Sequence, residues 1–144
     1  MPCSDGIEAE VLFNLFDDER GSLDARLFGD WVRGRLDDGA DLPRITPARL
    51  GLGLDYHRGP FQGDIQLKQV FGQDDTARLE TDTDGYTLLD AGISYTLAGT
   101  PAETRLFLRG SNLLDEDARR HTSFIKDRAP LAGRSALAGI NVSF

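Results

Sequence analysis

The sequence predicts an all-β fold, an antiparallel up-and-down meander of about seven long strands of the kind that builds transmembrane β-barrels. Apolar and polar residues alternate in about seven segments separated by turn-forming residues. All but the sixth of these segments run for at least 9 residues, whereas strands of soluble proteins usually have about 5 or 6. Short and longer connections also alternate along the chain, as they do in membrane barrels.

The expected strands are defined by their period-two pattern. In chain order they are 7–15, 23–31, 48–57, 61–71, 89–97, 105–111 and 136–144. The first is expected to place Ile7, Ala9, Val11, Phe13 and Leu15 on one face. We predict one outward apolar face that includes Leu50, Leu52, Leu54, Ile65, Leu67, Leu89 and Ile93. A slip of one residue would turn carboxylates toward lipid, so this register should be strongly specified.

The connections predict which end of the sheet faces which side of a membrane. Short connections are expected at Asp17–Ser22, Arg58–Pro60 and Gly99–Ala102, and longer ones at Asp37–Pro43, Gln73–Asp84 and Asp115–Ala132. If Phe144 lies at the periplasmic end, every short turn is periplasmic and every longer loop is external.

Aromatic residues gather near the strand ends on the apolar face. They are Phe13, Trp31, Tyr56, Phe61, Phe71, Tyr95 and Phe144. Such positions suit an interfacial girdle between headgroups and acyl chains. The alternative is that these rings fill one face of a soluble β-sandwich core, which would need an equally large second layer.

Composition excludes several functions. The 144 residues have a mean hydropathy of -0.34 and a net charge of -8, and this acidity argues against nucleic acid as a partner. No apolar run reaches the length of a transmembrane helix. The single cysteine, Cys3, excludes an internal disulfide framework. Met1–Asp5 has no features of a signal peptide, so either the chain is a piece of a longer exported protein or the barrel interpretation is wrong.

Residues that could carry chemistry are sparse, and we predict no catalytic, cofactor-binding or metal site and no enzymatic activity. His57 and His121 are expected on opposite sides of the membrane, each as a solvated polar residue. The acidic loop 73–84 is expected to be solvated as well. The inward faces carry opposite charges that should pair in a wet lumen, namely Glu8, Glu10, Asp24, Asp30, Asp55, Asp64 and Asp90 with Arg26, Arg49, Lys68, Arg105 and Arg109.

Three motifs in the C-terminal part resemble TonB-dependent outer-membrane receptors. Residues 84–95, DGYTLLDAGISY, are similar to that family's "GYTLLNAGLSY" strand. Residues 106–115, LFLRGSNLLD, resemble its penultimate strand, which an "NLLD" or "NLFD" box closes. Residues 121–134, HTSFIKDRAPLAGR, resemble the "HTSFLKDxAPLPGR" segment before the last strand, with Ala132 where the family commonly has proline. The wording is closest to a subgroup that includes zinc-uptake receptors.

The resemblance implies that residues 1–144 are the C-terminal part of a receptor barrel, without the plug domain and the signal peptide. The full-length parent would sit in the cell outer membrane and import a scarce ligand, such as a metal, a metal chelate or a cobalamin-like compound. The implied partners are outer-membrane lipid, the barrel-assembly machinery and that ligand, and no cofactor is implied. Two alternatives stay open, a small passive pore or structural barrel and a soluble β-sheet interaction domain.

Overall fold

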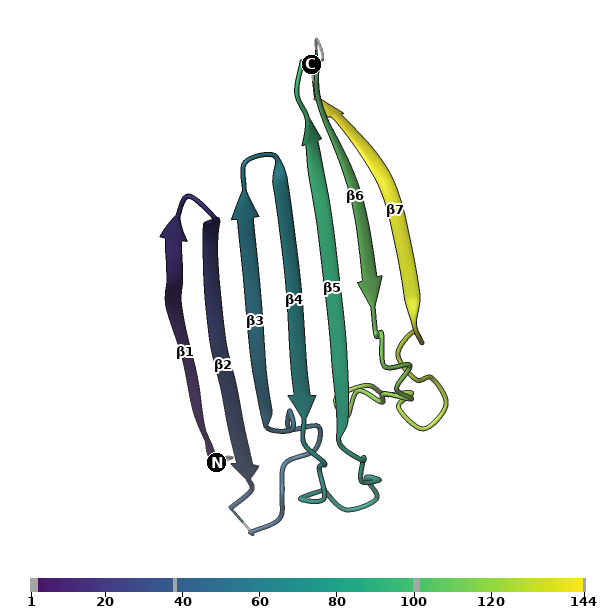
Figure 1. Cartoon of the computed structure of the whole chain (residues 1–144). Helices are drawn as coiled ribbons and strands as arrows, with labels where there is room; N and C mark the ends of the chain where they lie inside the picture. The colour runs from purple at the N-terminus through teal and green to yellow at the C-terminus, as the bar shows by residue number, and fades with distance from the viewer. Residues whose placement is uncertain (1–2, 38, 100–101, 144) are drawn as a thin grey trace.

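The computed structural model describes residues 3–37, 39–99 and 102–143. Within these ranges seven strands form one antiparallel sheet in chain order (Figure 1). The strands are β1 Cys3–Asp18, β2 Gly21–Arg35, β3 Arg49–Arg58, β4 Phe61–Val70, β5 Tyr86–Leu97, β6 Glu103–Ser111 and β7 Ser135–Ser143. The predicted all-β meander is therefore confirmed. Nowhere in the described ranges is there a helix of the length and apolarity needed to span a membrane.

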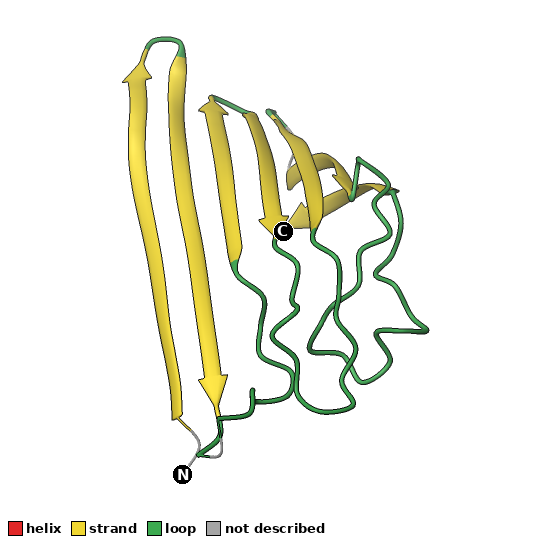
Figure 2. Ribbon diagram, turned by 90° about the horizontal axis from the view of Figure 1, so that it is seen from below, coloured by secondary structure: helices red, strands yellow, loops and turns green. Residues whose placement is uncertain are grey.

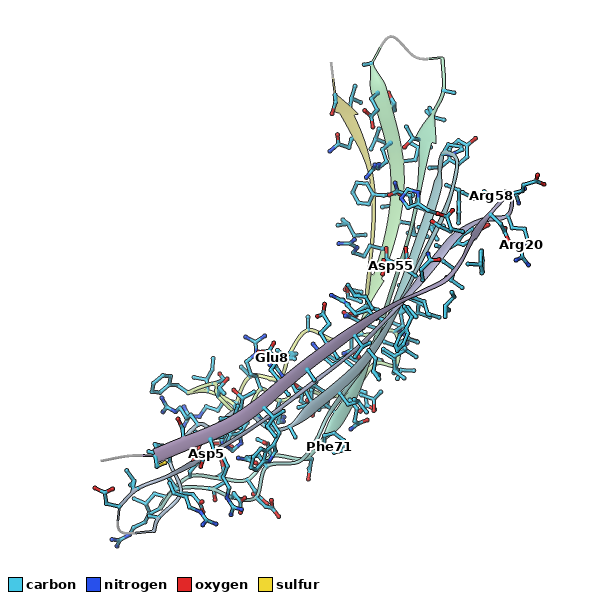
Figure 3. All side chains as sticks on the ribbon, turned by 90° about the vertical axis from the view of Figure 1, so that its left-hand side faces the viewer. Asp5, Glu8, Arg20, Asp55, Arg58 and Phe71 are labelled. Carbon is cyan, nitrogen blue, oxygen red and sulfur yellow. The ribbon has the colours of Figure 1, made fainter. Side chains whose placement is uncertain are left out.

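The strand register sorts side chains into an apolar and a polar face. One row of cross-strand neighbours consists of Val11, Leu27, Leu52, Leu67 and Leu89. Another row, of opposite parity, consists of Asp24, Asp55, Asp64, Gly92 and Arg109. Successive residues of a strand point to opposite faces, so these rows lie on different sides of the sheet. The sheet is curved, and Figure 3 shows Glu8 on its concave side and Phe71 on its convex side.

The sheet is a single layer without a conventional core. Among the described residues, the buried hydrophobic ones are Ala25, Val70 and Ala118. Large side chains of the apolar face remain exposed, including Leu52 at 44%, Ile65 at 43% and Ile93 at 50%. A soluble sandwich would cover such a face with a second layer, and the described part of the chain contains none. The convex face therefore requires an apolar environment outside this chain.

A β-bulge corrects one detail of the sequence prediction. The alternation was expected to keep Leu15 on the apolar face, but the β1–β2 register shifts between Asn14 and Phe16. A bulge adds one residue to one strand and breaks its alternation. As a result Phe16, rather than Leu15, pairs with Leu23, and its ring lies 6.5 Å from that of Tyr56.

The connections divide between the two ends of the sheet (Figures 1 and 2). The turns after β1 and β3 lie at the end of the sheet where β7 ends, and the loops 36–48, 71–85 and 112–134 lie at the opposite end. Gly21, the first residue of β2 after the first turn, has a φ of 114°, and a Cβ there would lie 2.3 Å from the His57 carbonyl oxygen. The expected separation of short and long connections is thus confirmed. Phe144 and part of the expected Gly99–Ala102 turn fall outside the described residues.

Candidate functional site

The loop end of the sheet holds the most densely connected polar residues of the described chain. Three loops meet there, the β2–β3 loop (36–48), the β4–β5 loop (71–85) and the β6–β7 loop (112–134). Their contacts converge on a set of residues that we call the loop clamp: Arg44, Ala77, Glu80, Thr81, Thr83, His121 and Lys126.

Glu80 is the hub of the loop clamp. Its side chain is only 11% exposed. The carboxylate accepts hydrogen bonds from the backbone N–H of Arg44, at 3.0 and 3.3 Å, and from that of Ala77 at 3.1 Å. Arg44 and Leu79 both have positive φ, 60° and 69°, a conformation that non-glycine residues adopt only where the surroundings enforce it. One carboxylate therefore fixes the backbone of two loops.

His121 and Lys126 attach the β6–β7 loop to this hub. His121 is 2% exposed and Lys126 6%. The imidazole Nδ1 lies 2.8 Å from Thr83 Oγ1 and 3.3 Å from Lys126 Nζ, and Nε2 lies 3.3 Å from Glu80 Oε1. The ammonium also donates to the Thr81 carbonyl and lies 3.7 Å from Glu80 Oε1. The arrangement is a buried ion pair with an imidazole beside it.

The surroundings set the charges of the clamp. Burial alone would raise the pKa of Glu80, but the amides of Ala77 and Arg44, together with His121 and Lys126, outweigh it and hold this pKa below its ordinary value. Burial lowers the pKa of His121, and the neighbouring Lys126 ammonium lowers it further. At neutral pH the clamp therefore contains an ionised Glu80 and a neutral His121.

Asn112 and Asp115 explain the NLLD wording in physical terms. The Asn112 side-chain amide donates to the carbonyls of Glu116 and Ala132 at 2.9 and 3.1 Å, and its side-chain oxygen accepts from Glu116 N–H at 3.0 Å. Asp115 accepts from the Arg134 amide at 2.9 Å. The motif thus ties the two ends of the β6–β7 loop together, a role that the sequence prediction did not assign.

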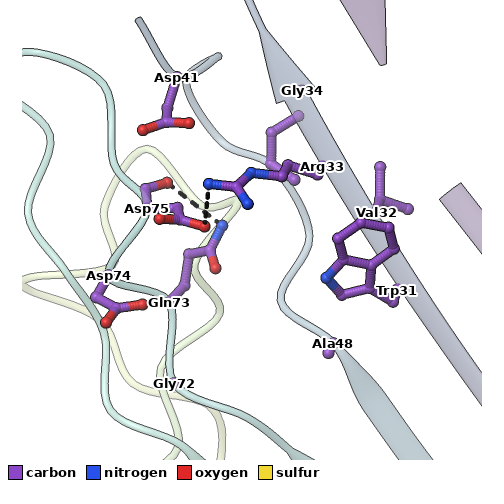
Figure 4. A pocket seen from close by; sticks show the side chains of 11 residues that line it. Trp31, Val32, Arg33, Gly34, Asp41, Ala48, Gly72, Gln73, Asp74 and Asp75 are labelled. Carbon is purple, nitrogen blue, oxygen red and sulfur yellow. Dashed lines mark hydrogen bonds and ion pairs between the residues drawn. The ribbon is translucent and has the colours of Figure 1, made fainter. Parts of the chain in front are cut away.

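A small cavity of about 190 Å³ lies beside the end of β2 (Figure 4). Its acidic residues are Asp41, Asp74 and Asp75, and Arg33 points into it, with its guanidinium 3.3 Å from Asp75 Oδ2. Across the described residues, no group of three or more His, Cys, Asp and Glu side chains is placed to hold a metal ion. The cavity is therefore a polar hollow in which the Arg33 guanidinium balances part of the negative charge of the aspartates.

The polar face of the sheet carries charges that only partly pair. Arg49 Nε lies 2.8 Å from Asp30 Oδ1, one of the expected pairings. Asp24, Asp55 and Asp64 instead lie side by side on neighbouring strands. A hollow of about 440 Å³ on the same face has Asp64 on one side and Arg105 and Arg109 on the other. This face suits a hydrated lumen wall with unevenly distributed charge.

The predictions for the two histidines, His57 and His121, agree with the structure to different degrees. They lie at opposite ends of the sheet, as predicted, and His57 is exposed. The expectation that His121 is solvated was wrong, because the β4–β5 loop folds over it. The expectation that loop 73–84 is solvated was likewise wrong for Glu80, whose side chain is only 11% exposed. The signal available in the sequence was the HTSFIKD wording, which places Lys126 five residues after His121.

Comparison with known proteins agrees with this architecture. The chain superposes on a solved structure titled copper transporter OprC with a TM-score of 0.85 at 20% sequence identity, covering 99% of this chain and 23% of that one. At this identity the likeness shows the fold alone, and this chain spans less than a quarter of the OprC chain. A family model described as TonB dependent receptor-like, beta-barrel, matches residues 4–113. Because that match covers most of the sequence, the chain belongs to the TonB-dependent receptor β-barrel family.

Proposed function

We propose that this chain is the C-terminal wall of an outer-membrane receptor whose complete protein imports a scarce ligand, such as a metal, a metal chelate or a cobalamin-like compound. The observation that carries the proposal is the family match over residues 4–113, on a sheet whose register gives one continuous apolar face. The likeness to a structure named as a copper transporter supports a metal as the ligand class. On this proposal the chain acts in transport and has no enzymatic activity.

Within that receptor, each region has its own task. The convex face contacts lipid, the concave face lines the lumen, and the loop clamp shapes the external mouth. The plug and the remaining barrel strands are supplied by parts of the receptor outside this chain. Assembly by the barrel-assembly machinery pairs β1 and β7 with further strands. Within the described part of the chain each of these two strands has a neighbour on only one side, and unpaired backbone groups in hydrocarbon cost several kcal/mol each.

The proposal is tested by exporting this chain alone, and separately the full-length receptor, into a strain that lacks the receptor. We expect the full-length receptor to restore uptake of labelled copper or zinc, and that uptake should disappear when the inner-membrane coupling protein is deleted. The isolated chain should restore none. Coupled uptake by the isolated chain would contradict the proposal, and leakage that does not need the coupling protein would favour the passive-pore alternative.

A further inference from the structure

We propose that the loop clamp is a proton-sensitive latch, in which protonation of His121 releases the β6–β7 loop from the β4–β5 loop. This property goes beyond the transport role proposed above and does not depend on the identity of the imported ligand. It rests on the geometry around one imidazole, on the burial of that imidazole and on the small number of contacts that join the two loops.

The neighbours of His121 fix its tautomer. A lysine ammonium can only donate hydrogen bonds, and Lys126 Nζ lies 3.3 Å from Nδ1. Nδ1 must therefore be the unprotonated, accepting nitrogen, and the Thr83 hydroxyl beside it, at 2.8 Å, can donate as well. The imidazole hydrogen is then on Nε2, which lies 3.3 Å from Glu80 Oε1. The geometry assigns a neutral Nε2–H imidazole.

Protonation would disrupt this arrangement because the new N–H would form on Nδ1. The Thr83 hydroxyl oxygen, at 2.8 Å, could accept that hydrogen. The His121 ring would nevertheless carry a positive charge 3.3 Å from the Lys126 ammonium, so an attractive contact would become a repulsion between like charges. Both residues are nearly inaccessible to water, at 2% and 6% exposure, and a low-dielectric environment strengthens the repulsion. One carboxylate, Glu80, would then have to neutralise two cations while it also binds two backbone amides.

The charged groups facing the imidazole are few. Glu80 faces it from the β4–β5 loop and Lys126 from its own loop. Asp127, the residue after Lys126 in the sequence, accepts a hydrogen bond from the Thr81 hydroxyl at 2.9 Å. Arg44 contributes its backbone amide to Glu80, while its guanidinium stacks on the Phe124 ring. Arg119 binds the Lys126 carbonyl. No second carboxylate of the described chain is in contact with His121 to compensate a positive charge there.

The junction between the two loops depends on the same residues. The side-chain contacts across it are Thr83–His121, Lys126–Thr81, Thr81–Asp127 and the contacts of Glu80 with His121 and Lys126. Displacing the imidazole therefore breaks two of these five contacts, and its repulsion of the Lys126 ammonium weakens the two that Lys126 makes. The strands beneath are paired by their own backbone hydrogen bonds and should not open with it.

The direction of the pH effect follows from the pKa values of the clamp. The pKa of His121 is lowered from its ordinary 6.5, so its stabilising contribution is complete above pH 6.5 and is lost as the pH falls through the lowered value. The pKa of Glu80 is lowered from 4.5, so this carboxylate stays ionised until the medium is more acidic. Release at a pH between 6.5 and 4.5 is therefore due to the imidazole, because Glu80 is still ionised there.

The first test uses the full chain, labelled with ¹⁵N-histidine, in detergent micelles. The chain contains two histidines, and loss of one signal in His121→Gln identifies the signal of His121. We expect the Nε2–H tautomer for His121 and a titration midpoint below 6.5, the ordinary value for histidine. Removal of the ammonium by Lys126→Met should raise this midpoint. An Nδ1–H tautomer, or a midpoint at or above 6.5, would overturn the proposal.

The second test measures the latch itself in membranes, in the full-length receptor that carries this chain. Spin labels are attached at Leu79 and Ile125, which are 99% and 59% exposed, after Cys3→Ser. The label-to-label distance distribution should be narrow at pH 7.5 and broad below the His121 midpoint, and it should stay narrow at both pH values in His121→Gln. A wild-type distribution that does not change across the His121 titration would refute the latch, whatever the variant does.

Discussion

In the seven-stranded sheet, which we call the strand wall, each strand pairs with its neighbours along most of its length. Apart from the bulge in β1, its side chains alternate between the two faces. In the loop clamp, three irregular loops are joined through a few contacts that converge on one carboxylate, Glu80. The wall therefore distributes its stability over many similar contacts. The clamp concentrates its stability in a few dissimilar ones.

This difference predicts how each region responds to substitution. At a position in the strand wall, the effect of a substitution on the free energy of unfolding should depend on whether the new residue is apolar or polar, because the surroundings of each face favour one of the two. At a position in the loop clamp, the effect should depend on whether one particular hydrogen bond or ion pair is lost, because no water is available to take the place of the lost partner of a buried charge. The following predictions test that contrast, from the largest expected effect to the smallest.

The largest effect is expected for Glu80→Ala. It removes the acceptor for the amides of Arg44 and Ala77 and leaves Lys126 as a buried charge without its counter-ion. The free energy of opening the clamp should fall by about 3–5 kcal/mol, measured by hydrogen exchange at those two amides. Asp82→Ala, an exposed change in the same loop, is the matched control. Equal losses of protection in the β3 and β4 strands would erase the distinction between clamp and wall.

A smaller effect is expected when an arginine enters the convex face. Ile65→Arg, near the middle of β4, should lower the free energy of unfolding in lipid vesicles by about 2–4 kcal/mol. Gln66→Arg, at the next position and on the concave face, should change it by less than about 1 kcal/mol. Denaturant titrations of the two variants give the comparison. Equal losses would mean that the two faces do not differ in environment.

A third substitution tests packing on the concave face. The Phe28 ring covers Gly51 on the neighbouring strand, and a Cβ there would lie 2.1 Å from Phe28 Cζ. Gly51→Ala should therefore destabilise the wall by about 1–3 kcal/mol. Gly53→Ala is the control on the same face of the same strand, because its Cβ would meet nothing closer than 3.7 Å. Unfolding midpoints of the pair should differ, and identical midpoints would show that the ring moves aside freely.

The smallest effect is expected at the turn end. Asp18 and Arg20 form an exposed ion pair at 2.6 Å, which water and salt screen. Asp18→Asn should leave the unfolding midpoint unchanged within error in 0.15 M salt. A clear loss there would mean that exposed pairs at this end stabilise the wall, contrary to the account above.

The wall could be predicted from the sequence because its side chains follow a repeating pattern. Leu50, Leu52 and Leu54 alternate with residues of the other face, and backbone pairing leaves one register that keeps all the apolar residues together. The bulge at Leu15 was missed because an extra residue leaves no mark in such a pattern when it is itself apolar.

The clamp could not be predicted in the same way. Glu80 and His121 are 41 positions apart in the sequence, and their contact depends on how two loops fold over each other. An acidic loop and a histidine among arginines are most simply interpreted as solvated. Burial arises only because the β4–β5 loop covers the β6–β7 loop and supplies the Ala77 amide to Glu80 and the Thr83 hydroxyl to His121.

The central claim, that the convex face contacts lipid and the concave face lines the lumen, is tested most directly by a spin-label scan from Gln62 to Gln69 in the membrane-inserted receptor after Cys3→Ser. Accessibility to oxygen, which concentrates in lipid, should alternate with period two and peak at Ile65 and Leu67, with minima at Asp64, Gln66 and Lys68. Oxygen accessibility without that period, or with its maxima at Asp64 and Gln66, would contradict the account.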